Sequence, residues 1–213
     1  LERARRPFRD VADVWCSTFA ESGDRVTEAQ YQEVIDALGK PRRLVQLGES
    51  EWFCRAKQLA QREDVRPFHW ELEFPEVFYT EKGEKDNPGF DCVIGNPPYG
   101  LLSEKAYIKN IFTSTSNNYD AYSAFIEQGQ RLLKDKGLHS YIAPVSWQTG
   151  SLFESLRGGL LEKNKFISII NLPFDVFKDA YIDTGVFVLQ KQLRERADSS
   201  VAIYEFPKNS KID

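Results

Sequence analysis

Four consecutive residues near the middle of the chain, Asn96, Pro97, Pro98 and Tyr99, combine a side-chain amide, two imino acids and an aromatic ring. They directly follow an apolar run, residues 91–95, which predicts a buried strand. Each proline fixes its own φ angle and favours an extended conformation in the residue before it. The sequence therefore predicts a rigid loop at the end of a strand, suited to gripping an exocyclic amino group on a flat ring.

The amino group of adenine shows what such a loop could do. Its nitrogen is a poor nucleophile because the lone pair is delocalised into the ring. Two acceptors beside its two N–H bonds would draw the nitrogen toward tetrahedral geometry, so that the lone pair could attack an electrophilic methyl group. Asn96 can offer its side-chain carbonyl and Pro97 its main-chain carbonyl. Tyr99 can stack on the base, which must first be flipped out of a duplex.

A bland interpretation of the same residues is a proline-stiffened turn, in which Tyr99 is a partly buried packing residue. Four residues are a short signal, and a motif of this length is a hypothesis until its context supports it. The preceding strand and the neighbouring sequence supply that context.

Segments on both sides of the tetrapeptide resemble adenine-specific DNA methyltransferases of the NPPY class. The likeness covers about residues 65–192. It is greatest to the methyltransferase part of type IIG restriction–modification enzymes and their phage-exclusion relatives. The segments that carry it are residues 68–78, 89–100, 122–127, 132–137, 141–144, 175–180 and 184–189.

The resemblance implies transfer of a methyl group from S-adenosylmethionine to N6 of a flipped adenine in duplex DNA. Asn96, Pro97, Pro98 and Tyr99 would be catalytic, and Asn96 would also border the cofactor. Phe125 falls where the family has an aromatic residue that lines the pocket for the cofactor's adenine. Phe177 falls where the family has a second stacking wall for the base, opposite Tyr99. From the residues alone, each phenylalanine could also be a core residue, an interpretation that weighs evenly for Phe125 and less for Phe177.

The cofactor side of such a site is incomplete in this sequence. The family holds S-adenosylmethionine with a glycine-rich turn after its first strand, yet no two of the 13 glycines are separated by a single residue. The chain has no methionine, not even an initiator, which predicts a piece of a longer protein. We therefore expect the turn to lie upstream and this chain alone to be inactive.

Charge and cysteine usage limit other functions. A net charge of −4 argues against a self-sufficient DNA-binding module, so we expect double-stranded DNA to be bound through the parent protein. Cys16, Cys54 and Cys92 lack metal-ligand spacing, so no metal is expected. They predict reduced thiols in a cytoplasmic protein, with Cys92 in the core. The resemblance implies that this protein is bacterial or archaeal. No Asp or Glu stands two positions before a Lys, so no nuclease of the commonest metal-dependent type is expected here.

Hydrophobic periodicity predicts a helical segment over residues 1–64 and the C-terminal part of a catalytic domain over residues 65–213. Within the first segment, a capping box at Thr27–Gln30 opens a helix, and Trp15 has the spacing of a core residue. Alternation over residues 68–74 predicts a half-exposed strand.

Beyond the first segment, strands alternate with helices, which predicts an α/β fold with an open, mostly parallel sheet. The resemblance adds a Rossmann-like class I methyltransferase sheet with an antiparallel final strand. Ligands bind such sheets at the carboxyl ends of the strands. Strands are expected at residues 90–95, 138–143, 166–172, 185–190 and 201–206, and helices at residues 103–112, 119–134 and 152–163.

Two other functions fit the tetrapeptide. One is a protein methyltransferase acting on the glutamine N5 amide of release factors, since an amide nitrogen has the same delocalised lone pair. Against it stand the segments after the loop and Phe177, which suits a base better than an amide. The other is a noncatalytic interaction module, and its case rests on the missing glycine turn.

Overall fold

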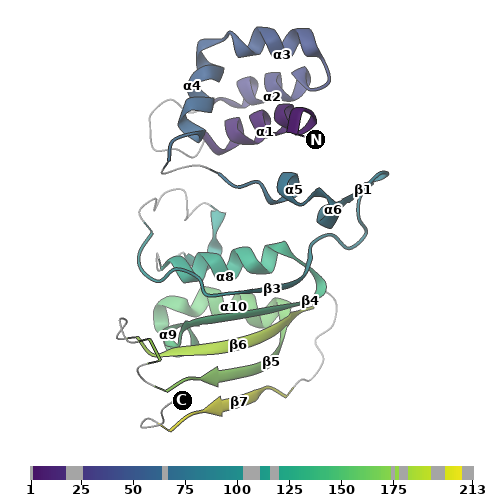
Figure 1. The fold of residues 1–213 in the computed structure, drawn as a ribbon. Coiled ribbons are helices and arrows are strands. Elements are labelled where there is room, and N and C mark those ends of the chain that lie inside the picture. The colour runs from purple at the N-terminus through teal and green to yellow at the C-terminus, as the bar shows by residue number, and fades with distance from the viewer. Residues whose placement is uncertain are drawn as a thin grey trace. The chain divides into compact units, whose positions relative to one another are not determined.

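The structure is a computed structural model that describes residues 2–17, 26–63, 67–102, 111–115, 120–173, 176–177, 182–192 and 200–207. The chain divides into two compact units, Leu1–Phe78 and Tyr79–Asp213 (Figure 1). Among the described residues, no helix has the length and apolar character needed to cross a membrane.

The first unit is helical, with a core built from side chains of α1 to α4. The predicted capping box is confirmed, because the Thr27 hydroxyl accepts from the Gln30 N–H at 3.3 Å and the Gln30 side chain accepts from the Thr27 N–H at 2.8 Å. Trp15 was expected in the core, but this prediction is wrong because the residue is 45% exposed. The elements are α1 (Glu2–Ser17), α2 (Glu28–Ala37), α3 (Pro41–Gly48), α4 (Glu51–Ala60), α5 (Trp70–Glu73) and α6 (Pro75–Phe78).

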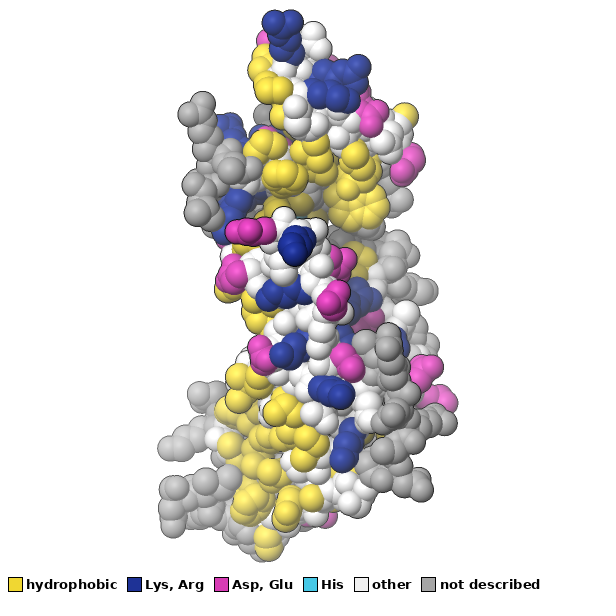
Figure 2. Space-filling view, turned by 90° about the vertical axis from the view of Figure 1, so that its right-hand side faces the viewer, with side chains coloured by type: hydrophobic (Ala, Val, Ile, Leu, Met, Phe, Trp, Pro, Cys, Tyr) yellow, Lys and Arg dark blue, Asp and Glu magenta, His cyan; other side chains and the backbone are white. Residues whose placement is uncertain are grey.

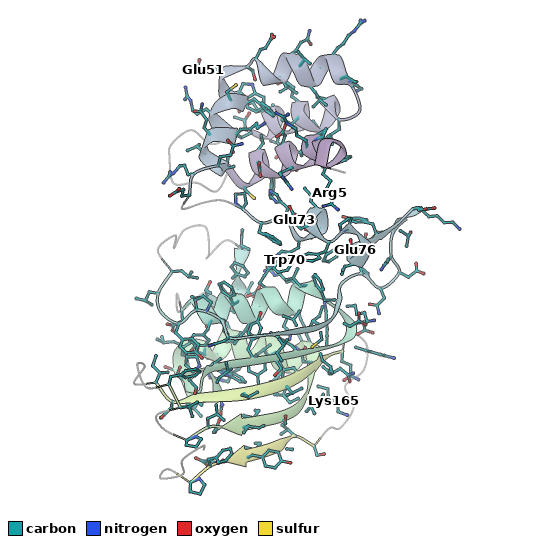
Figure 3. All side chains as sticks on the ribbon, viewed as in Figure 1. Arg5, Glu51, Trp70, Glu73, Glu76 and Lys165 are labelled. Carbon is teal, nitrogen blue, oxygen red and sulfur yellow. The ribbon has the colours of Figure 1, made fainter. Side chains whose placement is uncertain are left out.

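The strand predicted for residues 68–74 is wrong, since this segment contains helix α5 (Figure 3). The rings of Trp70 and Phe74 stack with their centroids 5.9 Å apart. A helical turn brings residues four apart together, whereas a strand would separate them by about 13 Å. Two tertiary contacts hold the segment to α1: Glu73 pairs with Arg9 at 2.8 Å, and His69 Nε2 lies 2.8 Å from an oxygen of Asp13. Side-chain packing has overridden the alternating pattern.

The second unit contains a five-stranded sheet and a small two-stranded one. Its elements are β1 (Tyr79–Thr80), β2 (Gly83–Glu84), β3 (Phe90–Gly95), η1 (Thr113–Thr115), α8 (Ala121–Leu132), β4 (Leu133–Pro144), α9 (Ser146–Thr149), η2 (Ser151–Phe153), α10 (Glu154–Lys163), β5 (Asn164–Asn171), β6 (Thr184–Lys191) and β7 (Ala202–Glu205). The predicted strands beyond residue 89 are thus confirmed, as are the helices around α8 and α10. The helix predicted for residues 103–112 falls mostly outside the described residues.

The larger sheet has the strand order β3-β4-β6-β5-β7. β3 pairs parallel with β4, and β5 pairs parallel with β7. β6 lies between β4 and β5 and is antiparallel to both. Four strands therefore run in one direction and β6 runs in the other, which confirms the α/β sheet with an antiparallel closing strand.

Helices cover one face of this sheet (Figure 1). Tyr122 and Ile126 of α8 and Leu156 and Leu160 of α10 share a buried cluster with Phe187 of β6 and other side chains of the unit. Burial of these apolar side chains is the main stabilising contribution in the unit. The same cluster supports the loop described below.

The opposite face of the sheet is open in the part of the chain that the structure describes. Cys92 lies in register with Leu138, and Ile94 in register with Ser140, on this open side. Ile94 is 78% exposed and Cys92 is also exposed, so the prediction of a buried strand with Cys92 in the core is wrong. β3 is an edge strand of the described sheet, and these side chains lie on the face opposite the buried cluster. Figure 2 shows hydrophobic side chains gathered in the lower part of the view, where the sheet lies.

Gly89, immediately before β3, occupies a position that only glycine can take. Its φ angle is +120°, and a Cβ there would lie 2.5 Å from the main-chain nitrogen of Lys134. A side chain would therefore be strained by the backbone conformation and would collide with the start of β4. The close approach sets where β3 begins beside β4.

A buried histidine lies between α8 and the sheet. His139 on β4 is fully buried, and its Nδ1 lies 2.8 Å from the side-chain nitrogen of Gln130. The rings of Tyr141 and Phe187 meet it edge-on, with centroid distances of 4.3 and 5.3 Å. Burial lowers the pKa of His139 to about 4, so the ring is neutral at pH 7.

This histidine predicts that the chain loses stability in mild acid. The unfolded chain takes up a proton near pH 6.5, whereas the folded chain resists protonation until about pH 4. The contribution of the neutral His139 to the free energy of unfolding is therefore complete above pH 6.5, and it is lost as the pH drops toward 4. We expect the free energy of unfolding, measured by urea denaturation, to be about 2 kcal/mol lower at pH 5 than at pH 7 on account of this group. His139→Phe should reduce the difference by that amount, and an unchanged difference would contradict the assignment.

The glycines of α8 and α10 provide a test of packing around the same histidine. A Cβ on Gly129 would lie 2.7 Å from Nε2 of His139, whereas a Cβ on Gly158 meets nothing within 4 Å. We expect Gly129→Ala to destabilise the chain by about 1–3 kcal/mol through overpacking. Gly158→Ala is the matched control and should stabilise by up to about 1 kcal/mol, because alanine favours the helix. Thermal denaturation in which both variants behave alike would contradict the packing.

Candidate active site

The tetrapeptide predicted to do chemistry lies at the carboxyl edge of the larger sheet. β3 and β4 are parallel and β5 runs in the same direction, so the ends of these strands at Gly95, Pro144 and Asn171 share one edge. Residues 96–99 follow directly on Gly95. This is the edge at which open α/β sheets bind ligands, as the sequence predicted.

The four residues of the loop differ in their exposure. The Asn96 side chain and Pro98 are exposed, Pro97 is buried, and Tyr99 is half-buried. A buried proline fixes the loop by packing as well as by its ring. The arrangement leaves the amide of Asn96 accessible to a substrate, and the catalytic roles of the four residues remain predictions.

Tyr99 joins the loop to the neighbouring strand. Its hydroxyl donates a hydrogen bond to the main-chain carbonyl of Ile142 on β4 at 3.2 Å. Its ring packs against the buried cluster beneath the sheet. Burial raises the pKa of Tyr99, so the hydroxyl keeps its proton and remains a donor.

Gly100 follows the loop and is bonded to the first residue of α8. Its φ angle is +114°, a conformation that favours glycine. The Gly100 carbonyl accepts from the Ala121 N–H at 2.8 Å, and Leu101 forms an isolated antiparallel bridge with Asp120. The chain is therefore also attached to the folded unit immediately after Tyr99.

A polar cluster that the sequence did not reveal lies where α8 begins. The hydroxyls of Tyr122 and Ser146 are 3.0 Å apart and link α8 to the first residue of α9, after β4. Burial raises the pKa of Tyr122, and it raises the pKa of Asp120 as well. Tyr122 stands in one of the resembling segments, but only the folded chain shows its hydroxyl beside the end of β4.

The structure describes the surroundings of Phe125 more fully than those of Phe177, the two aromatic residues predicted to line the site. Phe125 lies on the exposed side of α8 and is 43% exposed, so it is not a core residue of that helix. Phe177 is half-buried, but residues 174–175 and 178–181 on either side of it lie outside the described residues. The structure brings Asn96 to Tyr99 together with the start of α8. The stacking role of Phe177 opposite Tyr99 and the cofactor role of Phe125 remain predictions.

Phe125 and Asn96, the two residues predicted to border S-adenosylmethionine, are both exposed. Phe125 offers an exposed aromatic ring, and Asn96 is exposed at the sheet edge. The sequence has no glycine-rich turn to face them. Across the described ranges, no group of three or more His, Cys, Asp or Glu residues could hold a metal ion.

Proteins of known family are similar to this chain in sequence. A match of 38% identity over 152 residues joins this chain to RM.MjaORFECS2P of Methanocaldococcus jannaschii, which is named as a type II restriction enzyme and methyltransferase. That match covers 70% of this chain and 12% of the archaeal protein. The type II methyltransferase M.TthHB8I of Thermus thermophilus is 31% identical over 88 residues, which cover 36% of this chain and 21% of that protein.

A solved methyltransferase subunit of a type I restriction-modification system from Streptococcus thermophilus is 26% identical, with a TM-score of 0.46 over 57% of this chain and 27% of that one. The chain thus spans a small part of the length of the relatives it matches. The family model of the Eco57I restriction-modification methylases matches residues 13–177, which is most of the chain and includes the whole loop. The chain belongs to the Eco57I restriction-modification methylase family.

Proposed function

We propose that this chain supplies the substrate side of a DNA adenine-N6 methyltransferase within a restriction–modification or phage-defence protein. Membership of the methylase family supports methyl transfer. The choice of an amino group as acceptor is supported by one observation above all: Asn96 is exposed at the carboxyl edge of the sheet, on a loop that starts from the paired end of β3 and is bonded again at Tyr99 and Gly100.

The chemistry follows from the two acceptors of the loop. The Asn96 side-chain oxygen and the Pro97 main-chain oxygen each accept a hydrogen bond from one N–H group of the flipped adenine's amino group. Bound S-adenosylmethionine supplies the electrophilic methyl group. Attack of the amino nitrogen on the methyl carbon would break the methyl–sulfur bond and release S-adenosylhomocysteine. The two acceptors stabilise the positive charge that develops on the amino group, until one of its protons passes to water. Because the loop is already fixed, little order has to be gained when the base binds.

Tyr99 is the residue best placed to support the flipped base. Its ring is half-buried against the core, and its hydroxyl is held by β4. An aromatic ring with little freedom offers a stacking face at small entropic cost. A duplex substrate fits this arrangement only after base flipping, because a stacked base keeps its amino group within the helix.

The methyl donor requires residues beyond those of this chain. In the described part, β3 is an edge strand, and the apolar side chains of Ile94 and Leu138 are exposed on the open face, whereas parallel sheets are normally covered on both faces. The relatives contain several times more chain than the matched region. We propose that the glycine-rich turn for S-adenosylmethionine belongs to further chain of the complete protein.

Replacing Asn96 tests the function directly. In the protein made from the complete reading frame, Asn96→Ala should lower radiolabelled methyl transfer to duplex DNA by about a hundredfold or more, because one preorganised acceptor is lost. Asn87→Ala is the matched control for lost fold stability: its side chain bonds the main chain of Asp135 at the end of β3 away from the loop, so methyl transfer by the folded variant should be unchanged. Methylation of a release factor in place of DNA, or full DNA methylation by Asn96→Ala, would refute the proposal.

Calorimetry tests the incomplete cofactor site. The 213-residue chain titrated with S-adenosylmethionine should give no saturable heat at micromolar concentrations, because only one side of the site is present. The complete protein should bind under the same conditions. A dissociation constant on the order of micromolar for the chain alone would show that its own residues suffice.

A further inference from the structure

The parallel ladder between β3 and β4 ends abruptly at the loop. The last paired residues are Gly95 on β3 and Tyr141 on β4. Pro97 and Pro98 have no N–H, so neither can donate to β4 and extend the ladder. The rings that make the loop rigid therefore also remove the main-chain hydrogen bonds that would hold it to the sheet.

A side chain supplies a bond at this place. Ile142 follows Tyr141 on β4, and its carbonyl accepts from the Tyr99 hydroxyl at 3.2 Å. Ile142 is itself held on its other side, where it pairs with Val186 of β6. The acceptor thus belongs to a strand with neighbours on both sides, which makes it a fixed point of the sheet.

We propose that the Tyr99 hydroxyl takes the place of the main-chain donors that the two prolines lack, and is a positioning group for Asn96 and Pro97. This role is separate from stacking, which uses the face of the ring. For its effect on catalysis the inference rests on the proposed function. The pairing of Gly95 with Tyr141 fixes the start of the loop, and the Tyr99 hydroxyl, together with the bond from the Ala121 N–H to the Gly100 carbonyl, fixes its end.

Two contacts of Tyr99, one by packing and one by a hydrogen bond, leave its ring half-buried. One side of Tyr99 packs against the core cluster, and the hydroxyl reaches β4. The remaining exposure leaves ring surface for a ligand. A phenylalanine would keep that ring surface and the packing, but would leave the Ile142 carbonyl without this donor. The two roles of the residue can therefore be separated by removing a single oxygen atom.

Hydrogen exchange on the 213-residue chain tests the structural half of the inference. In Tyr99→Phe, the amides of Asn96, Tyr99 and Gly100 should exchange about fivefold faster than in the wild type, the effect expected for one hydrogen bond. The amides of β6 should be unchanged. Tyr204→Phe, which removes a hydroxyl from an exposed tyrosine of β7, is the matched control and should leave the loop unaffected. Unchanged exchange in Tyr99→Phe would overturn the inference.

Kinetics on the complete protein test the catalytic half. Tyr99→Phe should lower kcat about fivefold and change KM for duplex DNA by less than about twofold, because the acceptors are misplaced while the stacking face remains. Tyr99→Ala should raise KM as well, since it also loses the ring. If Tyr99→Phe loosens the loop and leaves kcat unchanged, the hydroxyl is structural only and the positioning role is overturned.

The two hypotheses fail in different ways. A wild-type protein that methylates no DNA adenine would refute the proposed function, and the exchange measurement would still decide whether the hydroxyl holds the loop. A wild-type enzyme that is active, paired with an equally active Tyr99→Phe variant, would refute the positioning role and leave the proposed function in place.

Discussion

Two imino acids at the end of a strand set the constraint on which the rest of this chain depends. Pro97 and Pro98 preset the backbone of the loop, and they also prevent it from joining the sheet through main-chain bonds. The folded unit compensates with a side-chain bond from Tyr99 to β4 and a main-chain bond from Ala121 to Gly100. Rigidity at Asn96 is thus obtained from the paired end of β3 before it and from these two bonds after it, while the Asn96 side chain stays exposed.

The surrounding fold serves this loop. Gly89 allows β3 to start close against β4, and β4 is held by β6 on its other side. α8 begins where the loop ends and buries its inner face on the same cluster that supports the ring of Tyr99. Stability and function therefore share residues, and a change in the core beneath β4 should be felt at the sheet edge. The neutral His139 is part of that core.

The strand–loop–helix order could be predicted from the sequence because its signals are local. Apolar runs, prolines and helical periodicity gave β3, α8 and β6 close to their observed bounds, and the tetrapeptide pointed to the loop. The Tyr99 bond could not be predicted, because it depends on the register that places Ile142 beside residues far away in sequence. Burial also failed locally: Cys92 looks like a core residue by its neighbours, yet it lies on an edge strand whose outer face is open in the described chain. Residues 68–74 alternate as a strand does, but aromatic packing folds Trp70 and Phe74 into a helical turn.

The central claim is that the loop selects the amino group of adenine. Digestion of DNA from a methylation-free host that expresses the complete reading frame, followed by mass spectrometry of the nucleosides, tests this most directly. N6-methyldeoxyadenosine should appear, and it should be missing from a host that expresses the Asn96→Ala variant. N4-methyldeoxycytidine as the only product, or no methylated base in DNA although the protein is made, would contradict the account.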